Sequence, residues 1–406
     1  MKKLYILFYI AGLTITGFAQ YKNDNVLYKT VYTQDLCNEL SSHPGYLLID
    51  VRTPGEYADT SSRGLNLGRF KNAVNIEVLE LGNRISEISN YKYKPVFVYC
   101  SHSQRSRRAS KMLADSGFTQ VFNINGGMTG LRQLPLEGNN CLYDKLETQN
   151  TYNIISAADL CTKISNNAKK ILLLDVRNDS AFKHISLDAK INSFGYFKNS
   201  MHIPLADLET NILKVPAGRE IIIIDLFGGE AAKAAELLKR NNYSNVSVLL
   251  EGLDAVNSTD RKTLACLPSA YISNLSYKII NAQELKSFLE TTNEYLFLDA
   301  RTTEEFTNKH KNYWQNIGHL ENAVNIPSTD LEAQWNKIEG YKTKPVIVYV
   351  FGSGTVAHEV ANTLVKKGFI NVMVLQGGLF NIGWTAANVK GFSSLAKLRV
   401  DVPERD

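Results

Sequence analysis

The stretch LLIDVR at Leu47–Arg52 returns twice, as LLLDVR at Leu172–Arg177 and as LFLDAR at Leu296–Arg301. Each stretch is an apolar run that ends in aspartate, with an arginine two residues later. The three aspartates are 125 and 124 residues apart. A constant period of this kind is typical of an internal repeat. We therefore expect three copies of one domain in the chain.

Three further markers return in each copy with nearly the same period. They are a polar turn before a short apolar stretch, a continuous apolar strand, and a strand that runs into glycine. In chain order the turns are KNAVNI, KNSMHIP and ENAVNIP, the strands are VFVYC, IIIID and VIVYV, and the glycine segments are NINGG, VLLEG and VLQGG. Chance similarity would not keep four markers in register, so these matches indicate a triplication.

The apolar strands predict the fold class. A run such as IIIID at Ile221–Asp225 shows no polar alternation, which indicates a strand buried on both faces, as in a parallel sheet covered by helices. The segments Ser106–Ser116 and Glu230–Arg240 are rich in helix formers and have one apolar face. We expect three α/β domains, each a small and mainly parallel sheet flanked by helices, over residues 25–140, 150–262 and 275–393.

Composition excludes several classes of protein. The 406 residues are 44% hydrophobic and 21% charged, which is average for a globular protein and excludes a disordered chain, a collagen-like fibre and a polytopic membrane protein. The formal net charge is +5, and basic residues form no long runs. Charge therefore gives no reason to expect a nucleic-acid partner.

The first nineteen residues are typical of a secretory signal peptide. Lys2 and Lys3 precede the apolar run Leu4–Phe18, and the small residues Gly17 and Ala19 suit a cut before the next residue. The apolar run is short for a membrane span, although an uncleaved anchor is the alternative. We expect an exported protein, periplasmic or secreted, in an environment that permits disulfides.

The candidate active site is the loop after the first copy's apolar strand, in VYCSHSQRSRRAS. In parallel α/β sheets, ligands bind beyond the carboxyl ends of the strands, where this loop lies. Cys100 ends the strand and Arg105 follows five residues later, where a helix is expected to begin. A helix N-terminus, the loop amides and a nearby guanidinium all favour a thiolate. Cys100 is therefore the candidate nucleophile.

These elements resemble those of the rhodanese-like (sulfurtransferase) family, in three tandem copies that cover nearly the whole mature chain. The family loop is commonly C-x-x-G-x-R followed by Ser, Thr or Ala. The catalytic Cys100 and the substrate-binding loop match it at three positions and depart at one. The substrate-binding residues are Ser101, His102, Ser103, Gln104, Arg105 and Ser106, of which Arg105 and Ser106 match and Ser103 replaces the usual glycine.

The resemblance implies a double-displacement reaction. Cys100 would take sulfur from a donor, either a small sulfur-containing anion such as thiosulfate or a persulfide, and hold it as a cysteine persulfide. A thiol or cyanide would then accept that sulfur. The resemblance implies no cofactor beyond this intermediate and no metal, and an envelope protein is a possible further partner.

The second and third copies lack this chemistry. Asp225 stands at the cysteine position of the second copy, with Glu230 at the arginine position. Val350 stands at the cysteine position of the third copy, and no cation follows it. Two carboxylates would repel an anionic substrate, so we expect both copies to be inactive. We also expect Asp225 to act as a helix cap.

Several alternatives remain open from the sequence alone. With two inactive copies, the chain could be a non-catalytic binding or scaffold protein of the cell envelope, and a persulfide relay to a partner protein is equally compatible with the loop. A phosphatase or arsenate reductase is disfavoured, because those relatives use a loop one residue longer. The roles expected of other charged residues are a structural ion-pair cluster of Asp50, Arg52 and Glu56, and guidance of anionic donors by Arg107 or Arg108.

The other four cysteines form two pairs by position. Cys37 and Cys161 lie 124 residues apart in early helices, and Cys141 and Cys266 lie 125 apart after the last strands. The third copy has neither. This joint presence predicts the disulfides Cys37–Cys141 and Cys161–Cys266, with four free buried thiols as the alternative.

Overall fold

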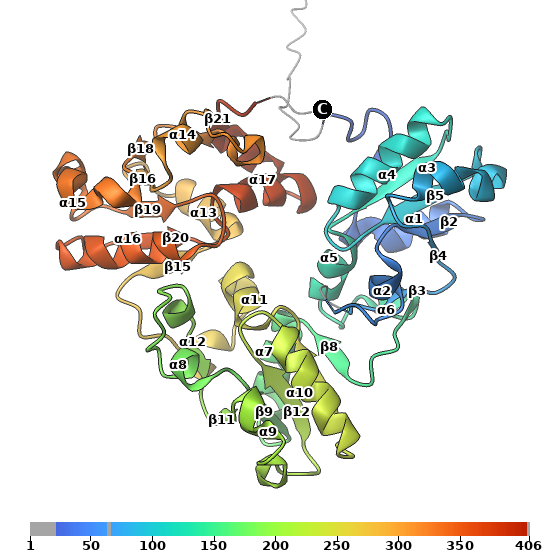
Figure 1. The fold of residues 1–406 in the computed structure, drawn as a ribbon, viewed down its shortest axis with the longest axis horizontal. Coiled ribbons are helices and arrows are strands. Elements are labelled where there is room, and N and C mark those ends of the chain that lie inside the picture. Colours follow the sequence, from blue (N-terminus) through green and yellow to red (C-terminus); the bar gives the residue numbers. More distant parts are fainter. Residues whose placement is uncertain (1–21, 63–65, 404–406) are drawn as a thin grey trace, which may run out of the picture.

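The computed structural model describes residues 22–62 and 66–403 (Figure 1). The predicted signal peptide lies outside the described residues. The described chain forms three lobes, each built on a five-stranded sheet in which every strand pairing is parallel. The predicted fold class, three tandem α/β domains with helix-flanked sheets, is confirmed.

The first domain has the sheet order β1-β6-β5-β2-β4. Its strands are β1 (Lys29–Tyr32), β2 (Leu47–Asp50), β3 (Arg69–Phe70), β4 (Val74–Asn75), β5 (Val96–Tyr99), β6 (Val121–Asn125) and β7 (Leu146–Glu147). Its helices are α1 (Leu36–Ser42), α2 (Pro54–Tyr57), α3 (Leu81–Arg84), α4 (Gln104–Asp115), α5 (Gly127–Gln133) and α6 (Asn140–Tyr143). All residues of β2 and β5 are buried, as the unbroken apolar pattern predicts.

The second domain repeats this arrangement in the order β11-β9-β12-β13-β8. Its strands are β8 (Asn153–Ile155), β9 (Ile171–Asp175), β10 (Tyr196–Phe197), β11 (Met201–His202), β12 (Glu220–Ile224), β13 (Val246–Leu249) and β14 (Tyr271–Ile272). Its helices are α7 (Ala157–Asn167), α8 (Asp179–Phe182), α9 (Leu205–Leu208), α10 (Gly229–Arg240), α11 (Gly252–Ser258) and α12 (Leu267–Ala270).

The third domain has the order β15-β20-β19-β16-β18. Its strands are β15 (Lys278–Ile280), β16 (Leu296–Asp299), β17 (His319–Leu320), β18 (Val324–Asn325), β19 (Val346–Tyr349), β20 (Val372–Leu375) and β21 (Arg399–Val400). Its helices are α13 (Ala282–Leu289), α14 (Thr303–Phe306), α15 (Leu331–Gln334), α16 (Thr355–Lys366) and α17 (Gly378–Asn388).

Each sheet has an apolar cluster on both faces, which is the layer arrangement of a doubly covered parallel sheet. In the first domain, Phe97 and Phe122 pack on one face with Leu36 of α1. Val96 and Val98 face the other way and pack with Leu113 of α4. Burial of both faces fixes the carboxyl ends of the central strands side by side, and the β5–α4 loop begins there.

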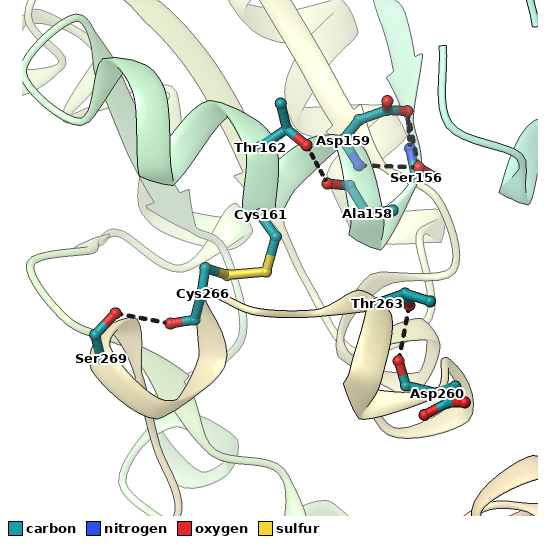
Figure 2. The surroundings of a disulfide bond; sticks show 9 residues. All are labelled: Ser156, Ala158, Asp159, Cys161, Thr162, Asp260, Thr263, Cys266 and Ser269. Atoms are coloured by element: carbon teal, nitrogen blue, oxygen red, sulfur yellow. Dashed lines mark hydrogen bonds between the residues drawn. A yellow bond between two sulfur atoms is a disulfide. The ribbon is translucent and has the colours of Figure 1, made fainter. Parts of the chain in front are cut away.

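The two predicted disulfides are present. Cys37 and Cys141 join α1 to α6 with a Cα–Cα distance of 6.3 Å. Cys161 of α7 joins Cys266, the residue before α12, with a Cα–Cα distance of 5.1 Å (Figure 2). Each bridge ties the start of its domain to the segment after the last sheet strand.

The domains contact one another through the ends of their last sheet strands. Asn125, the last residue of β6, donates to the carbonyl of Ala387 at the end of α17, at 2.9 Å. Gln376 after β20 donates to Asp254 of α11, at 3.0 Å. Leu250 after β13 packs in an apolar cluster of the first domain. Each of the three lobes therefore contacts the other two, and they lie around a common centre (Figure 1). Over the described residues, no helix has the length and apolar character needed to cross a membrane.

Candidate active site

A short loop joins β5 to α4 in the first domain. Cys100 directly follows β5, and α4 begins at Gln104. The segment after β6 is hydrogen-bonded to this loop, because the amide of Met128 donates to the carbonyl of Cys100 at 2.9 Å. A Cβ atom on Gly127 would come within 2.3 Å of that carbonyl oxygen, so this close approach requires glycine.

The Cys100 sulfur lies at the base of the loop. Its side chain is fully buried, with 0% exposure. The amide of Ser103 donates to Sγ at 3.1 Å, and the Ser106 hydroxyl lies 3.6 Å from it. All five cysteines are among the described residues, and Cys100 alone is outside a disulfide. The sulfur is thus enclosed, but by polar groups at the helix N-terminus rather than by apolar side chains alone.

Ser103 adopts the backbone conformation that glycine would supply. Its φ is +93°, in the left-handed region, and Gly228 at the same place in the second domain has φ +90°. The hydroxyl of Ser103 accepts a hydrogen bond from the amide of Gly126 at 2.6 Å. This bond offsets part of the cost of a side chain at positive φ, so the loop keeps its shape without the family's glycine.

Two residues hold the Arg105 side chain over the loop. Its guanidinium donates to both carboxylate oxygens of Glu56, at 2.6 and 2.7 Å, and to the Ser101 hydroxyl at 2.8 Å. The pKa of Arg105 is raised, chiefly by the Glu56 hydrogen bond, and Cys100 is among the smaller causes. The Cys100 sulfur is therefore close enough to interact electrostatically with the guanidinium, although the two share no hydrogen bond among the described residues.

Glu56 was predicted to join a structural cluster with Asp50 and Arg52, and that prediction is wrong in part. Asp50 and Arg52 form a buried ion pair of 2.6 Å, but Glu56 binds Arg105 instead. Burial alone would raise the pKa of Glu56, but the hydrogen bond and charge of Arg105, with bonds from Thr53, lower it to about 2. Glu56 is thus part of the candidate site. Its signal in the sequence is weak, because 49 residues separate it from Arg105.

His102 and Gln104 form the outer rim of the loop. His102 is exposed and its ring lies between the hydroxyls of Ser101 and Thr129, at 3.0 and 3.2 Å. Its Nε2 is 4.0 Å from a carboxylate oxygen of Glu251, which belongs to the second domain. Gln104 is exposed. These two predicted site residues therefore lie at the loop without contacting the sulfur.

Arg107 does not guide substrates, contrary to the sequence-based expectation. Its side chain is buried and pairs with Asp24 at 2.9 Å, and it also donates to Asn388 of the third domain at 3.0 Å. A guanidinium enclosed in this way is unavailable to a donor in solution. Arg108, on the next position of α4, is exposed.

The second domain shows what the loop amides do when an anion is present. The Asp225 carboxylate accepts hydrogen bonds from the amides of Gly228 at 2.6 Å, Glu230 at 2.7 Å and Ala231 at 3.0 Å. We call these backbone donors the anion cradle. The equivalent positions in the first domain are residues 103, 105 and 106, of which Ser103 donates its amide to Cys100 Sγ at 3.1 Å. Burial raises the pKa of Asp225, and the three amides oppose that rise. The Asp225 side chain thus accepts from two amides in the first turn of α10, as a helix cap does, but the N-cap position predicted for it belongs to Gly228.

The Glu56–Arg105 clamp has no counterpart in the other two domains. The residue six positions after the strand aspartate is Ala181 in the second domain, where Glu230 stands at the arginine position. In the third domain it is Glu305, which accepts from Gln315 at 2.9 Å. The loop after Val350 is one residue longer, and α16 begins at Thr355 without a left-handed cap. Only the first domain combines a thiol, an anion cradle and a cation.

Comparison with known proteins identifies related sequences. A family model described as Rhodanese-like domain matches residues 33–134, 157–259 and 281–384. "Uncharacterized protein YqhL" of Bacillus subtilis is 32% identical over 130 residues, which is 31% of this chain and 90% of that protein. A "Sulfurtransferase" of Allochromatium vinosum is 30% identical over 96 residues, 24% of this chain and 80% of that protein.

Two other similarities are partial. A "tRNA uridine(34) hydroxylase" of Cytophaga hutchinsonii is 32% identical over 85 residues, but this covers 20% of this chain and only 25% of that protein. Among solved structures, a thiosulfate sulfurtransferase from Pseudomonas aeruginosa is 15% identical, with 86% of this chain and 66% of that chain covered and a TM-score of 0.22.

Proposed function

The chain belongs to the family of rhodanese-like domains, and we propose that it is an exported sulfurtransferase that carries sulfane sulfur as a persulfide on Cys100. The observation that carries this proposal is the pairing of Cys100 with an anion cradle whose copy in the second domain binds a carboxylate through three amides. The charged outer sulfur of a cysteine persulfide is bonded to Sγ, just as each charged oxygen of Asp225 is bonded to Cγ. The negative charge therefore lies two bonds beyond Cβ in both side chains. The same amides would stabilise it.

The proposed reaction has two displacements. In the first, the Cys100 thiolate attacks the outer sulfur of thiosulfate, an S–S bond forms, and the bond from that sulfur to the sulfonate group breaks with release of sulfite. In the second, an acceptor thiolate or cyanide attacks the outer sulfur, and Cys100 leaves as the thiolate. Arg105 and the anion cradle stabilise negative charge in both steps. The Arg105 side chain is 31% exposed, so its charge can still act on an anionic donor.

Export is supported by the two disulfides, because such bonds persist in oxidising compartments and are rare in the cytosol. The N-terminal pattern of a short basic region, an apolar run and small residues supports the same proposal. Expression of the full chain with a C-terminal tag, followed by cell fractionation and N-terminal sequencing, tests it. An intact N-terminus on cytosolic protein would reject export.

Thiosulfate:cyanide sulfurtransfer by the mature protein tests the catalytic proposal. We expect thiocyanate release by the wild type and none above background by Cys100→Ser. Incubation with donor alone should add the mass of one sulfur to the peptide that contains Cys100. Equal thiocyanate release by both proteins would reject catalysis through Cys100, and a mass increment on the wild type without turnover would point to a different acceptor.

A second candidate is a binding protein of the cell envelope that performs no chemistry. It is favoured by the absence of a nucleophile from two of the three loops and by the complete burial of Cys100. The two candidates differ in one measurable property. A binding protein would form no persulfide on Cys100 with thiosulfate or with small-molecule persulfides.

A further inference from the structure

A chain of buried polar side chains leads away from Cys100 through the first domain. Its members are at most 4% exposed, and in order from the sulfur they are Ser106, Asn123, Asn125 and Arg107. At the positions of Ser106 and Asn123, the second domain has Ala231 and Val248, and the third domain has Ala357 and Val374. The two links next to the sulfur are therefore polar only in the domain that has the cysteine.

The links are short hydrogen bonds. The Ser106 hydroxyl donates to Asn123 Oδ1 at 2.6 Å, and Asn123 Nδ2 donates to Asn125 Oδ1 at 2.8 Å. Arg107 Nη2 donates to the same Asn125 oxygen at 2.9 Å. Buried polar groups are costly unless they are satisfied, so a continuous chain in an otherwise apolar layer indicates a specific role.

Arg107 determines the direction of every bond in this chain. A guanidinium only donates, so Asn125 must turn its oxygen toward Arg107. That oxygen also accepts from the amide group of Asn123, which leaves the Asn123 oxygen to face Ser106. The single hydroxyl hydrogen of Ser106 is then used on an acceptor, because its other neighbour, the Ser103 carbonyl at 3.1 Å, also only accepts. The Ser106 oxygen therefore presents lone pairs to the Cys100 sulfur at 3.6 Å.

The far end of the chain is completed by the third domain. Arg107 Nη1 donates to the side-chain oxygen of Asn388 at 3.0 Å, and Asn125 Nδ2 donates to the Ala387 carbonyl at 2.9 Å. Both acceptors lie at the C-terminal end of α17, where helix carbonyls lack partners within the helix and the dipole favours a cation. Arg107 also pairs with Asp24, at 2.9 Å.

We propose that the third domain, through Asn388 and the orientation of Arg107, holds the Ser106 hydroxyl as a hydrogen-bond acceptor for Cys100, so that the resting cysteine is kept as a thiol. This inference rests on the proposed function and assigns a role to a domain without a nucleophile. Thiolates are the reactive and oxidisable form of cysteine, so a resting thiol would be protected in an oxidising compartment. When thiosulfate reacts, the thiol loses its proton as the sulfur attacks, and the displaced sulfite carries that proton away as hydrogen sulfite.

A titration of the Cys100 thiolate by ultraviolet absorbance in the full chain, with Cys100→Ser subtracted, tests the proposal without any sulfur donor. In Asn123→Val, which copies the residue of both other domains, Ser106 loses its 2.6 Å acceptor and keeps only the Ser103 carbonyl at 3.1 Å, with which a thiolate would then compete for the hydroxyl hydrogen. We expect the titration midpoint to fall by about one pH unit, since hydrogen bonds to charged groups are the stronger ones. Asn388→Leu should also lower the titration midpoint. Asn388→Asp, which keeps an acceptor for Arg107, should leave the midpoint at its wild-type value.

The matched control is Ser247→Val, which removes a buried polar side chain from a sheet strand of the second domain. It should leave the midpoint unchanged. Among these variants only Asn388→Asp adds a charge. The charged groups near the sulfur and the hydrogen-bonded side chains are otherwise unchanged, and they are Arg105, Glu56, Asp50, Arg52, His102, Glu251 and Asp24.

An unchanged midpoint in Asn123→Val would overturn the proposal. A shift in Asn123→Val without one in Asn388→Leu would overturn the part assigned to the third domain. Neither result depends on persulfide formation. Failure of the proposed function would be seen separately, as the lack of a one-sulfur mass increment on wild-type Cys100.

Discussion

At the scale of single residues, Ser103 shows how a loop keeps a left-handed turn without glycine. The strain of φ +93° is opposed by the hydrogen bond that its hydroxyl accepts from the Gly126 amide. Ser103→Gly relieves strain of about 1 kcal/mol and loses a bond of about the same worth, so we expect stability close to wild type. Ser103→Ala keeps the strain, loses the bond and leaves a buried amide unpaired, which should cost about 1–2 kcal/mol.

The ranking of the two Ser103 variants can be measured by urea unfolding with a thiol reagent present. Cys100 is the only cysteine outside a disulfide, so its modification reports unfolding of the first domain alone. Equal stability of Ser103→Ala and wild type would show that the Gly126 bond contributes nothing.

The Glu56–Arg105 clamp predicts a pH dependence of stability. The folded pKa of Glu56 is lowered from 4.5 to about 2, so its contribution is complete above pH 4.5 and is lost as the pH falls through about 2. At neutral pH we expect Glu56→Gln to lower the unfolding free energy of the first domain by about 2–3 kcal/mol, which is slightly less than the shift itself implies because Arg105 is partly exposed.

The measurement compares wild type with Glu56→Gln from neutral to acid pH, with a dipyridyl disulfide reagent that reacts with thiols in acid. The difference should stay constant down to about pH 5 and shrink toward pH 2. The control is the same comparison in an Arg105→Met background, where the pH dependence should be much smaller. A difference that grows toward acid would contradict the assignment of Glu56 as the partner of Arg105.

What the sequence could predict at this scale follows from distance along the chain. Cys100, Ser103 and Ser106 lie within seven residues, so motif and helix geometry were enough to place them at one loop. The Arg105–Glu56 pair spans 49 residues and the Arg107–Asn388 bond spans 281. Arginine side chains of one helix turn look alike in a sequence, and tertiary packing alone decides which carboxylate or amide each one meets.

At the scale of elements, the β-strand–loop–helix unit occurs three times, which separates the anion cradle from the chemistry. The second domain retains the left-handed cap at Gly228 and the inward-facing amides, and binds its own Asp225. What it lacks is the thiol and the clamp formed by Glu56 and Arg105. If sulfur transfer takes place on Cys100 as proposed, the comparison of the two domains predicts that the cradle alone is not sufficient and that the charged clamp is also required.

Transplanting the site into the second domain tests this division. In a Cys100→Ser background, Asp225→Cys should add a thiol to the second cradle but no thiocyanate release above background, because Glu230 repels the anionic donor. Adding Glu230→Arg and Ala181→Glu should raise the rate by about tenfold or more. Full activity of the single Asp225→Cys change would show that the clamp is dispensable.

Strand positions were predictable because burial on both faces leaves an unbroken apolar run. Helix positions were predictable because the segments are rich in helix formers and have one apolar face. The predicted helices 106–116 and 230–240 correspond to α4 (Gln104–Asp115) and α10 (Gly229–Arg240). The earlier start of α4 reflects its capping by Ser103 in a left-handed conformation, which a serine at that position does not announce. Loop shape was thus the least predictable part of each unit, and the site is built from loops.

At the scale of the whole molecule, the disulfides are distributed unevenly over the three domains. The first two domains each have a bridge that closes a loop, with cysteines 104 and 105 residues apart, and none of the third domain's residues is a cysteine. In the chain-entropy account, a closed loop of this length stabilises a fold by about 4–5 kcal/mol at most. Reduction should therefore weaken the first and second domains and leave the third largely unchanged.

Hydrogen exchange of the full chain with and without reductant measures this effect domain by domain. We expect faster exchange in the central strands β5 and β12 after reduction and little change in β19. Alkylation of the denatured chain should modify one cysteine before reduction and five after it, because four of the five are paired. The third domain contacts the first through Arg107, so a moderate increase confined to the end of α17 would still agree with the prediction. Equal acceleration of β19 would instead show that the three domains unfold as one cooperative unit, so that the third domain would also contribute to the stability of the first.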